Sequence, residues 1–268
     1  MLIKTLVENT SISRDYEMEH GLSLYLETNR HKLLFDAGAS AAFARNATKM
    51  AVDVTDVDLA VISHGHYDHG GGLQVFLDIN EQAKVYLNKK AFDRHYSAGP
   101  NGAKMDIGLD EALLTQDRFI FAGERLVIDD TLELFAHVKA ARLNPSGNQH
   151  LFMEVNGVIE PDDFAHEQNM ILEEEENTVL VTGCAHKGIV NILEHFRLLK
   201  GYYPSHVIGG FHLYNSSPQV LAEIGAYLLS TRAMFYTGHC TGIEAYTSLK
   251  SMIGEKMRCL STGEQIII

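Results

Sequence analysis

The chain has 268 residues, 46% of them apolar, which is enough for one large α/β domain with a substantial core. Its formal net charge of −13 disfavours non-specific binding to nucleic acid, so we expect no such partner. Three cysteines at unpatterned spacing disfavour a disulfide framework. We find no signal peptide and no membrane-spanning run, so we predict a cytoplasmic protein without membrane association.

Apolar runs predict three strands in the first part of the chain, at 2–7, 22–28 and 32–38. His20 lies in the turn before the second strand, where a simple loop role and a role in substrate binding both fit. The third strand ends at Asp36 and a glycine turn. A carboxylate there can cap a helix, or it can orient a metal-bound histidine from behind. An alanine-rich helix is predicted at 39–50.

The most informative stretch follows an apolar strand at 59–63 and contains the pattern His-x-His-x-Asp-His. His64 and His66 are two residues apart on an extended segment, so both imidazoles can reach one ion. Asp68 and His69 follow as the chain turns into a helix, so they can face a second ion nearby. Imidazole nitrogen and carboxylate oxygen suit zinc, and also iron or manganese. The stretch therefore predicts a metal site.

The middle of the chain contains short strands separated by turns. A strand at 84–87 completes a β-loop-α-β unit, and the irregular stretch 89–118 is expected to be an insertion that covers the substrate. The strands predicted after it lie at 118–121, 132–135, 151–155, 169–172 and 177–182, with the last two forming a hairpin.

Three later apolar strands each lead to a histidine, namely His186, His212 and His239. A single histidine after a strand is usually an ordinary loop residue. However, the carboxyl ends of strands gather at one edge of an α/β sheet, so the repetition indicates that these imidazoles converge. The remaining predicted elements are helices at 189–199 and 217–230, a helix opened by a capping box of Thr241 and Glu244, and strands at 257–260 and 265–268.

Four motifs in this order resemble those of the metallo-β-lactamase superfamily. They are Phe-Asp-Ala-Gly at 35–38, the histidine loop at 64–69, Gly-Cys-Ala-His at 183–186 and Thr-Gly-His-Cys-Thr-Gly at 237–242. More narrowly, the chain is similar to the subgroup of the archaeal dihydropterin-ribofuranosylaminobenzene-phosphate synthase. The resemblance covers nearly the whole chain. It implies an α/β fold, a four-layer αββα sandwich, as a single domain over 1–268 with the insertion around 89–118.

The resemblance also implies a ligand set. One ion would be held by His64, His66 and His186, and a second by Asp68, His69 and His239. Asp36 would support the loop from behind. Zinc is the expected metal, as one or two ions, with iron and manganese as alternatives.

The chain departs from the family at two positions. The bridging Asp that the superfamily places between the motifs of His186 and His239 is absent, and His212 falls near that place. His212 could replace the Asp as a ligand or contact the substrate. His166 stands where the subgroup more often has an acidic residue, and we expect it to be structural. For Cys184 and Cys240, which flank proposed ligands, we expect packing roles because neighbours in a turn usually point apart.

The predicted function is a metal-dependent hydrolase that uses a metal-bound hydroxide on a small substrate, either phosphorylated or of the ester or lactone type. Asp68 and His212 are the candidate catalytic residues, and His20 and His212 the candidate substrate-binding residues. The alternatives are a transferase like the synthase, a di-iron redox protein and a metal-binding sensor without turnover. A nuclease is disfavoured by the acidic composition. A homo-oligomer is compatible with the sequence.

Overall fold

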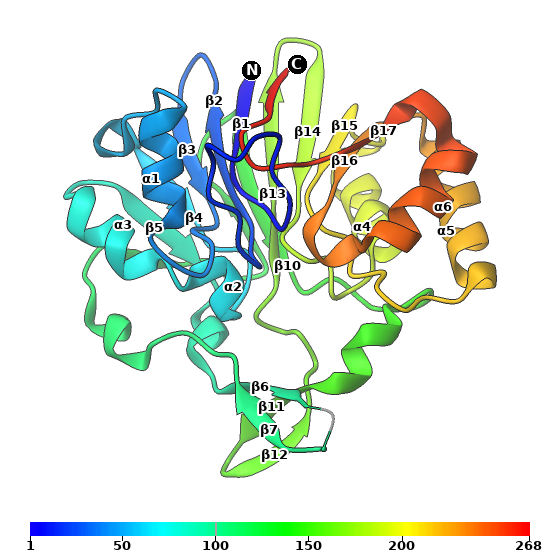
Figure 1. Cartoon of the computed structure of the whole chain (residues 1–268), viewed down its shortest axis with the longest axis horizontal. Coiled ribbons are helices and arrows are strands. Elements are labelled where there is room, and N and C mark those ends of the chain that lie inside the picture. The colour runs from blue at the N-terminus through cyan, green and yellow to red at the C-terminus, as the bar shows by residue number, and fades with distance from the viewer. Residues whose placement is uncertain (100) are drawn as a thin grey trace.

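Two seven-stranded β-sheets pack face to face and carry helices on their outer faces (Figure 1). The computed structural model describes residues 1–99 and 101–268; Pro100, in the predicted insertion, lies outside them. The first sheet contains, in spatial order, β18 (Gln265–Ile267), β1 (Leu2–Val7), β2 (Ser23–Glu27), β3 (Lys32–Phe35), β4 (Leu59–Val61), β5 (Lys84–Leu87) and β8 (Phe119–Phe121). The second contains β17 (Met257–Cys259), β16 (Met234–Thr237), β15 (His206–Ile208), β14 (Asn177–Val181), β13 (Gln168–Glu174), β10 (Leu132–Ala136) and β9 (Arg125–Val127). The predicted αββα sandwich is confirmed.

The space between the sheets is filled by the inward faces of both. Leu24 and Leu33 of the first sheet and Met170 and Val181 of the second are fully buried in one cluster. Burying an aliphatic side chain of this size contributes about 1.5–3 kcal/mol, so this layer holds the two halves of the molecule together.

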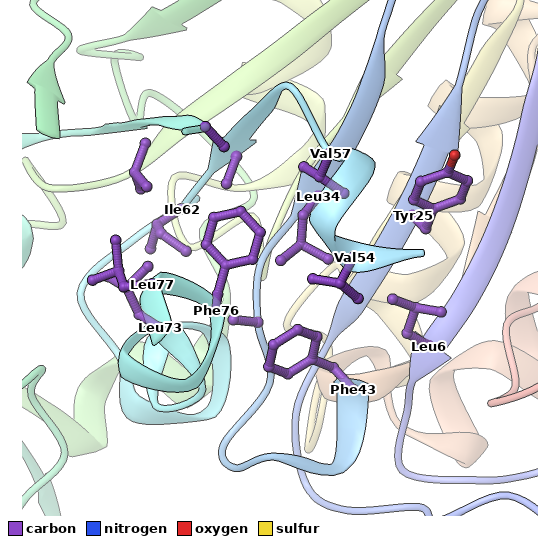
Figure 2. Packing of buried hydrophobic residues seen from close by; sticks show 14 of the residues in the cluster. Leu6, Tyr25, Leu34, Phe43, Val54, Val57, Ile62, Leu73, Phe76 and Leu77 are labelled. Carbon is purple, nitrogen blue, oxygen red and sulfur yellow. The ribbon is translucent and has the colours of Figure 1, made fainter. Parts of the chain in front are cut away.

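Helices cover the outer faces. On the first sheet, α1 (Ala42–Lys49) and α3 (Leu73–Ile79) direct Phe43 and Phe76 toward Leu34 and its neighbours (Figure 2). On the second sheet, α4 (Ile189–Lys200), α5 (Pro218–Thr231) and α6 (Ile243–Ile253) form the other outer layer. Each sheet is therefore buried on both faces, which explains why so many strands read as continuous apolar runs.

A third sheet of four strands lies below the sandwich in Figure 1. Its order is β12 (Val158–Pro161), β11 (Leu151–Val155), β6 (His95–Ala98) and β7 (Lys104–Asp106). We expected the stretch 89–118 to be irregular, but it supplies two strands, β6 and β7, which pair with each other. β6 also pairs with β11, more than fifty positions later. Such short strands with a distant partner give little periodic signal in sequence.

The strands that precede the proposed ligands run parallel within each sheet. β3 pairs with β4 in this way, as β14 does with β15 and β15 with β16. Their carboxyl ends therefore meet at one edge of the sandwich, where the short helix α2 (Tyr67–Gly70) also lies. Within the described residues, no helix is long and apolar enough to cross a membrane.

The predicted capping box at the start of α6 is wrong. The helix begins after Gly242, and no side chain caps it. The hydroxyl of Thr241 is engaged elsewhere, accepting a hydrogen bond from the backbone N–H of Phe211 at 3.0 Å and lying 2.6 Å from Oγ1 of Thr237. Thr241 ties the turn after β16 to the turn after β15, so tertiary contact replaces the local cap.

Candidate metal centre

Six buried side chains from both halves of the molecule converge where the strands end. The loop after β4 and the helix α2 supply four of them, the turn between β14 and α4 supplies one, and the turn after β16 supplies one. These side chains are His64, His66, Asp68, His69, His186 and His239. They are the six residues that the sequence suggests as ligands, and together they form what we call the metal centre.

The spacing of their donor atoms suits metal ions. Nε2 of His64 lies 3.1 Å from Nδ1 of His66, and their donors lie within 4.8 Å of a donor of His186. Nε2 of His239 lies 3.1 Å from Nε2 of His69 and 3.2 Å from Oδ2 of Asp68. Ligands on a tetrahedral zinc ion, bound at 2.0–2.1 Å, are about 3.3 Å apart. Two groups of donors therefore have the separation that two ions would require.

Asp36 supports the loop from behind. Its carboxylate is fully buried, and it accepts hydrogen bonds of 2.7 Å from the backbone N–H and the hydroxyl of Ser63 and from Nδ1–H of His69. The hydroxyl of Ser63 in turn lies 2.8 Å from Nδ1 of His64. Both imidazoles therefore carry their proton on Nδ1 and leave Nε2 free to face an ion, as is usual for metal-bound histidines.

Two asparagines that the sequence did not single out hold the other imidazoles. Oδ1 of Asn148 lies 3.1 Å from Nδ1 of His186, and Oδ1 of Asn9 lies 2.8 Å from Nδ1 of His239. Nε2 of His186 is then left buried, with no hydrogen-bond partner among the described residues. An orphaned nitrogen of this kind is costly in a folded protein unless something binds it, so the donor set fits a metal ion.

Four residues at the centre have backbone conformations in the left-handed region. Asp36, Ala185, His212 and His239 have φ angles of 57°, 56°, 48° and 48°. Residues with a Cβ rarely adopt this region, and each such conformation costs about 1–3 kcal/mol unless the surroundings hold it. The clustering of these angles shows that the turns are shaped to aim side chains at the centre.

Burial and charge set the protonation of the ligands. Burial, together with the neighbouring imidazoles, holds the pKa values of His64, His66 and His186 well below the usual range, so they are neutral. Burial acts to raise the pKa of Asp68, but His69 and His239 outweigh it and leave that pKa below its usual value. Neutral imidazoles and an ionised carboxylate are the forms that bind metal. Burial acts to lower the pKa of His239, but its hydrogen bond to Asp68 outweighs burial and raises that pKa to about 9, so His239 would lose a proton on binding an ion.

The two candidate substrate-binding histidines also lie at the centre. His20 is exposed, and its Nε2 is 3.3 Å from Oδ2 of Asp68. Nδ2 of Asn9 contacts Nδ1 of His20 at 3.3 Å, which fixes the neutral tautomer with a proton on Nε2. His212 is half-buried, with its ring centroid 4.3 Å from that of His186. Both therefore border the metal centre from the solvent side.

A cavity of about 720 Å³ opens onto the centre. The inserted third sheet and its connections contribute Met105, Ile107 and Leu151 to its wall, and Tyr214 and Ile243 contribute from the second half of the molecule. Among the described residues that line the cavity there is no lysine or arginine. The cavity therefore combines apolar walls with a floor of imidazoles, and the insertion borders the site.

Gly65 separates the first two histidines, and no larger residue fits there. A Cβ at this position would lie 2.3 Å from the carbonyl oxygen of Ala91. The backbone N–H of Gly65 donates a hydrogen bond to Nδ1 of His166 at 2.9 Å, and Nε2 of His166 lies 3.3 Å from Oδ2 of Asp162. His166 thus buttresses the loop from behind.

We expect Gly65→Ala to displace the loop and lower metal affinity about 10–100-fold, the range found when groups behind metal ligands are disturbed. Metal content after dialysis against a zinc buffer would measure the effect. Gly123→Ala is the matched control, because a Cβ there meets nothing within 4 Å. Equal zinc retention by the two variants would contradict the expected effect.

The fold and the buried donors define a class, the metal-binding αββα sandwiches. The family model of the metallo-beta-lactamase superfamily matches residues 18–217, and the chain belongs to this superfamily. Two proteins of Methanocaldococcus jannaschii are similar to it. The uncharacterized protein MJ0448 is 29% identical over 257 residues, covering 94% of each chain. The 7,8-dihydropterin-6-methyl-4-(β-D-ribofuranosyl)-aminobenzene-5′-phosphate synthase is 24% identical over 282 residues, covering 98% of this chain and 95% of the relative.

Solved structures agree with this assignment. Tm1679, described as a metal-dependent hydrolase of the β-lactamase superfamily, is 30% identical with a TM-score of 0.87, covering 100% of this chain and 99% of that one. YhfI from Bacillus subtilis, described as a metallo-β-lactamase fold protein, is 12% identical with a TM-score of 0.60, covering 99% of each chain. The second likeness concerns the fold alone. The predicted superfamily and the subgroup resemblance are thereby confirmed.

Proposed function

We propose that the protein is a metal-dependent hydrolase of small molecules with a two-ion centre. The observation that carries the proposal is the convergence of five buried imidazoles and one carboxylate, held from behind, four of which line one cavity. The superfamily model and the similarity to a metal-dependent hydrolase support it. Zinc is the proposed metal, because these donors at these spacings suit it and because neutral imidazoles are its usual ligands.

His64, His66 and His186 would hold one ion, and Asp68, His69 and His239 the other. Ions bound there would lower the pKa of a water molecule toward ~7 and polarise a substrate oxygen. Asp68 is placed to accept a proton, because its Oδ2 faces both the donors of the centre and Nε2 of His20. His20 faces the same carboxylate and orients it, which restricts the directions from which Asp68 can accept a proton. His20 can also contact the substrate at the mouth of the cavity.

His212 is proposed to bind the substrate. Its imidazole lines the cavity beside that of His186, with the ring centroids 4.3 Å apart. A substrate carbonyl or phosphoryl oxygen could lie next to this imidazole and be oriented above the ions. The same imidazole would then stabilise charge that develops on this oxygen during hydrolysis.

The lining of the cavity favours one of the predicted substrate types. A phosphate monoester carries two negative charges and usually meets arginine or lysine, but neither lines the described part of the cavity. The apolar walls instead suit an ester, a lactone or a phosphodiester with an apolar group. The same observation, together with the net charge of −13, counts against a nucleic-acid substrate.

Metal analysis combined with a panel of ester, lactone, thioester, phosphodiester and phosphomonoester substrates tests the proposal. We expect about two zinc ions per chain and turnover of an ester, lactone or phosphodiester. Iron with a visible colour and redox activity would instead identify the di-iron alternative. Stoichiometric metal without turnover of any substrate would identify the sensor. Transfer of a group to an acceptor other than water would identify the transferase.

Removal of the ions should also destabilise the fold. The centre joins the two halves, and without ions the Nε2 atom of His186 is left buried and unpaired. A ligand bound at 1,000 times its dissociation constant adds about 4 kcal/mol to the stability of the folded state. We therefore expect chelation to lower the thermal midpoint by at least about 5 °C, and re-addition of zinc to restore it. An unchanged midpoint in metal-free protein would contradict this expectation.

A further inference from the structure

The thiol of Cys184 lies among the proposed ligands, although the centre as described gives it no role. Cys184 is 3% exposed and forms no disulfide, and its Sγ is 3.1 Å from Nε2 of His69. The expected packing role rested on neighbours in a turn pointing apart. Ala185 has a φ of 56°, and this left-handed residue turns the chain so that Cys184 and His186 both face the centre.

The sulfur is close to donors of both proposed ions. It lies within 4.8 Å of donor atoms of His64 and His69, which belong to different ions. It is within the same distance of donors of His186 and His239, again one from each ion. A ligand placed between two groups of donors is in the position of a bridge.

The charge of the donor set favours an additional anionic ligand. Two divalent cations bring four positive charges into a buried site, and Asp68 is the one anion among the six proposed ligands. Asp36 cannot move in, because Ser63 and His69 occupy its carboxylate. His212, near the place of the absent bridging Asp, brings an imidazole and no negative charge. A thiolate binds zinc strongly, and coordination removes the thiol proton.

We propose that Cys184 binds as a thiolate shared by the two ions, in place of a bridging carboxylate. The thiol proton leaves to solvent as two metal–sulfur bonds form. The inference rests on the two-ion centre of the proposed function but not on the hydrolytic reaction. A shared sulfur would also set the distance between the two ions, because it would attach both of them to the turn after β14.

Cys240 provides the matched control. It is also close to the centre, with its sulfur within 4.8 Å of the donors of Cys184 and His239. However, its Sγ accepts the backbone N–H of His212 at 3.3 Å and contacts the carbonyl oxygen of Cys184 at 3.5 Å. These backbone contacts hold the sulfur in the packing role that we expected for both cysteines, so Cys240 should not bind an ion.

X-ray absorption at the zinc edge tests the proposal on the zinc-loaded wild-type protein. Zinc–sulfur bonds of about 2.3 Å are resolved from zinc–nitrogen bonds of 2.0–2.1 Å. With two zinc ions bound, we expect about one sulfur per zinc. About half a sulfur per zinc would overturn the sharing of the thiolate, and the absence of sulfur would overturn the inference while leaving the two-ion centre intact. A protein that binds no metal would overturn both.

Cobalt substitution identifies which cysteine is involved and does not depend on activity. The cobalt-loaded wild type should show the near-ultraviolet thiolate-to-cobalt charge-transfer band. Cys240→Ser should keep this band, whereas Cys184→Ser should lose it and bind cobalt at least about 10-fold more weakly. Loss of the band in Cys240→Ser with its retention in Cys184→Ser would overturn the assignment. Should Cys184→Ser fail to fold, the wild-type absorption data and the Cys240→Ser spectrum still decide the question.

Discussion

His66→Ala is expected to empty the first ion site and to remove hydrolytic activity. Nδ1 of His66 faces Nε2 of His64 at 3.1 Å, so alanine would remove one of the three imidazoles proposed to hold that ion. We expect metal affinity at this site to fall at least about 100-fold, the upper end of losses seen when only a supporting group is removed. Activity should fall at least about 1,000-fold, because the water at the centre would return toward its ordinary pKa. Metal content and turnover of the best substrate of the panel measure both effects.

His195→Gln is the control for this substitution. His195 lies on α4 and stacks on Phe135 with the ring centroids 5.3 Å apart, away from the cavity. The control should keep both ions and full turnover. Full activity of His66→Ala with one ion lost would reject the two-ion mechanism, and full activity with both ions retained would reject His66 as a ligand.

Asp36→Asn is expected to lower both the stability of the fold and the metal affinity of the centre, although Asp36 does not line the cavity. The carboxylate accepts three hydrogen bonds, one at Oδ1 and two at Oδ2. The NH₂ group of an amide would face the backbone N–H of Ser63 at the first place, or both the hydroxyl of Ser63 and Nδ1–H of His69 at the second. Leaving a buried donor unsatisfied costs about 1–3 kcal/mol, and the lost charge adds to this, so we expect about 2–4 kcal/mol less stability. Metal affinity should fall about 10–100-fold, as for other residues that orient metal-bound histidines.

Denaturant unfolding and zinc competition measure the two consequences separately. Asp117→Asn changes an exposed carboxylate and serves as the control, with an expected change within about 0.5 kcal/mol. If Asp36→Asn matched this control in both measurements, the supporting role of Asp36 would be excluded. A loss of stability with unchanged zinc affinity would show that Asp36 serves the fold and leaves the ligands untouched.

The sequence predicts those residues of the centre that lie close together along the chain or directly after an apolar strand. The loop from His64 to His69 carries its ligands within six residues, between a strand and a helix that periodicity reveals. His186, His212 and His239 each follow an apolar strand, and the tendency of strand ends to gather at one edge predicts their convergence. Element boundaries were also close to those observed, as for α5, predicted at 217–230 and found at Pro218–Thr231.

The supporting residues could not be predicted because their signals are not local. Asn9 contacts His239 from 230 positions away, and Asn148 contacts His186 from 38 positions away. Each is a single asparagine without a surrounding pattern. The position of Cys184 beside the proposed ligands was not predicted, because the left-handed turn at Ala185 has no signature when the residue is not glycine. The pairing of β6 with β11 was not predicted either, because the two strands lie far apart in the sequence.

The division of the ligand set between the two sheets has a mechanical consequence. His64, His66, Asp68 and His69 come from the first half of the sandwich, whereas His186 and His239 come from the second. Neither half holds all the proposed ligands of either ion, so bound cations would act as a reversible cross-link between the halves, with a strength that depends on metal supply. A cell short of the metal would hold a looser molecule, and proteolytic turnover could then match the amount of protein to the amount of available cofactor.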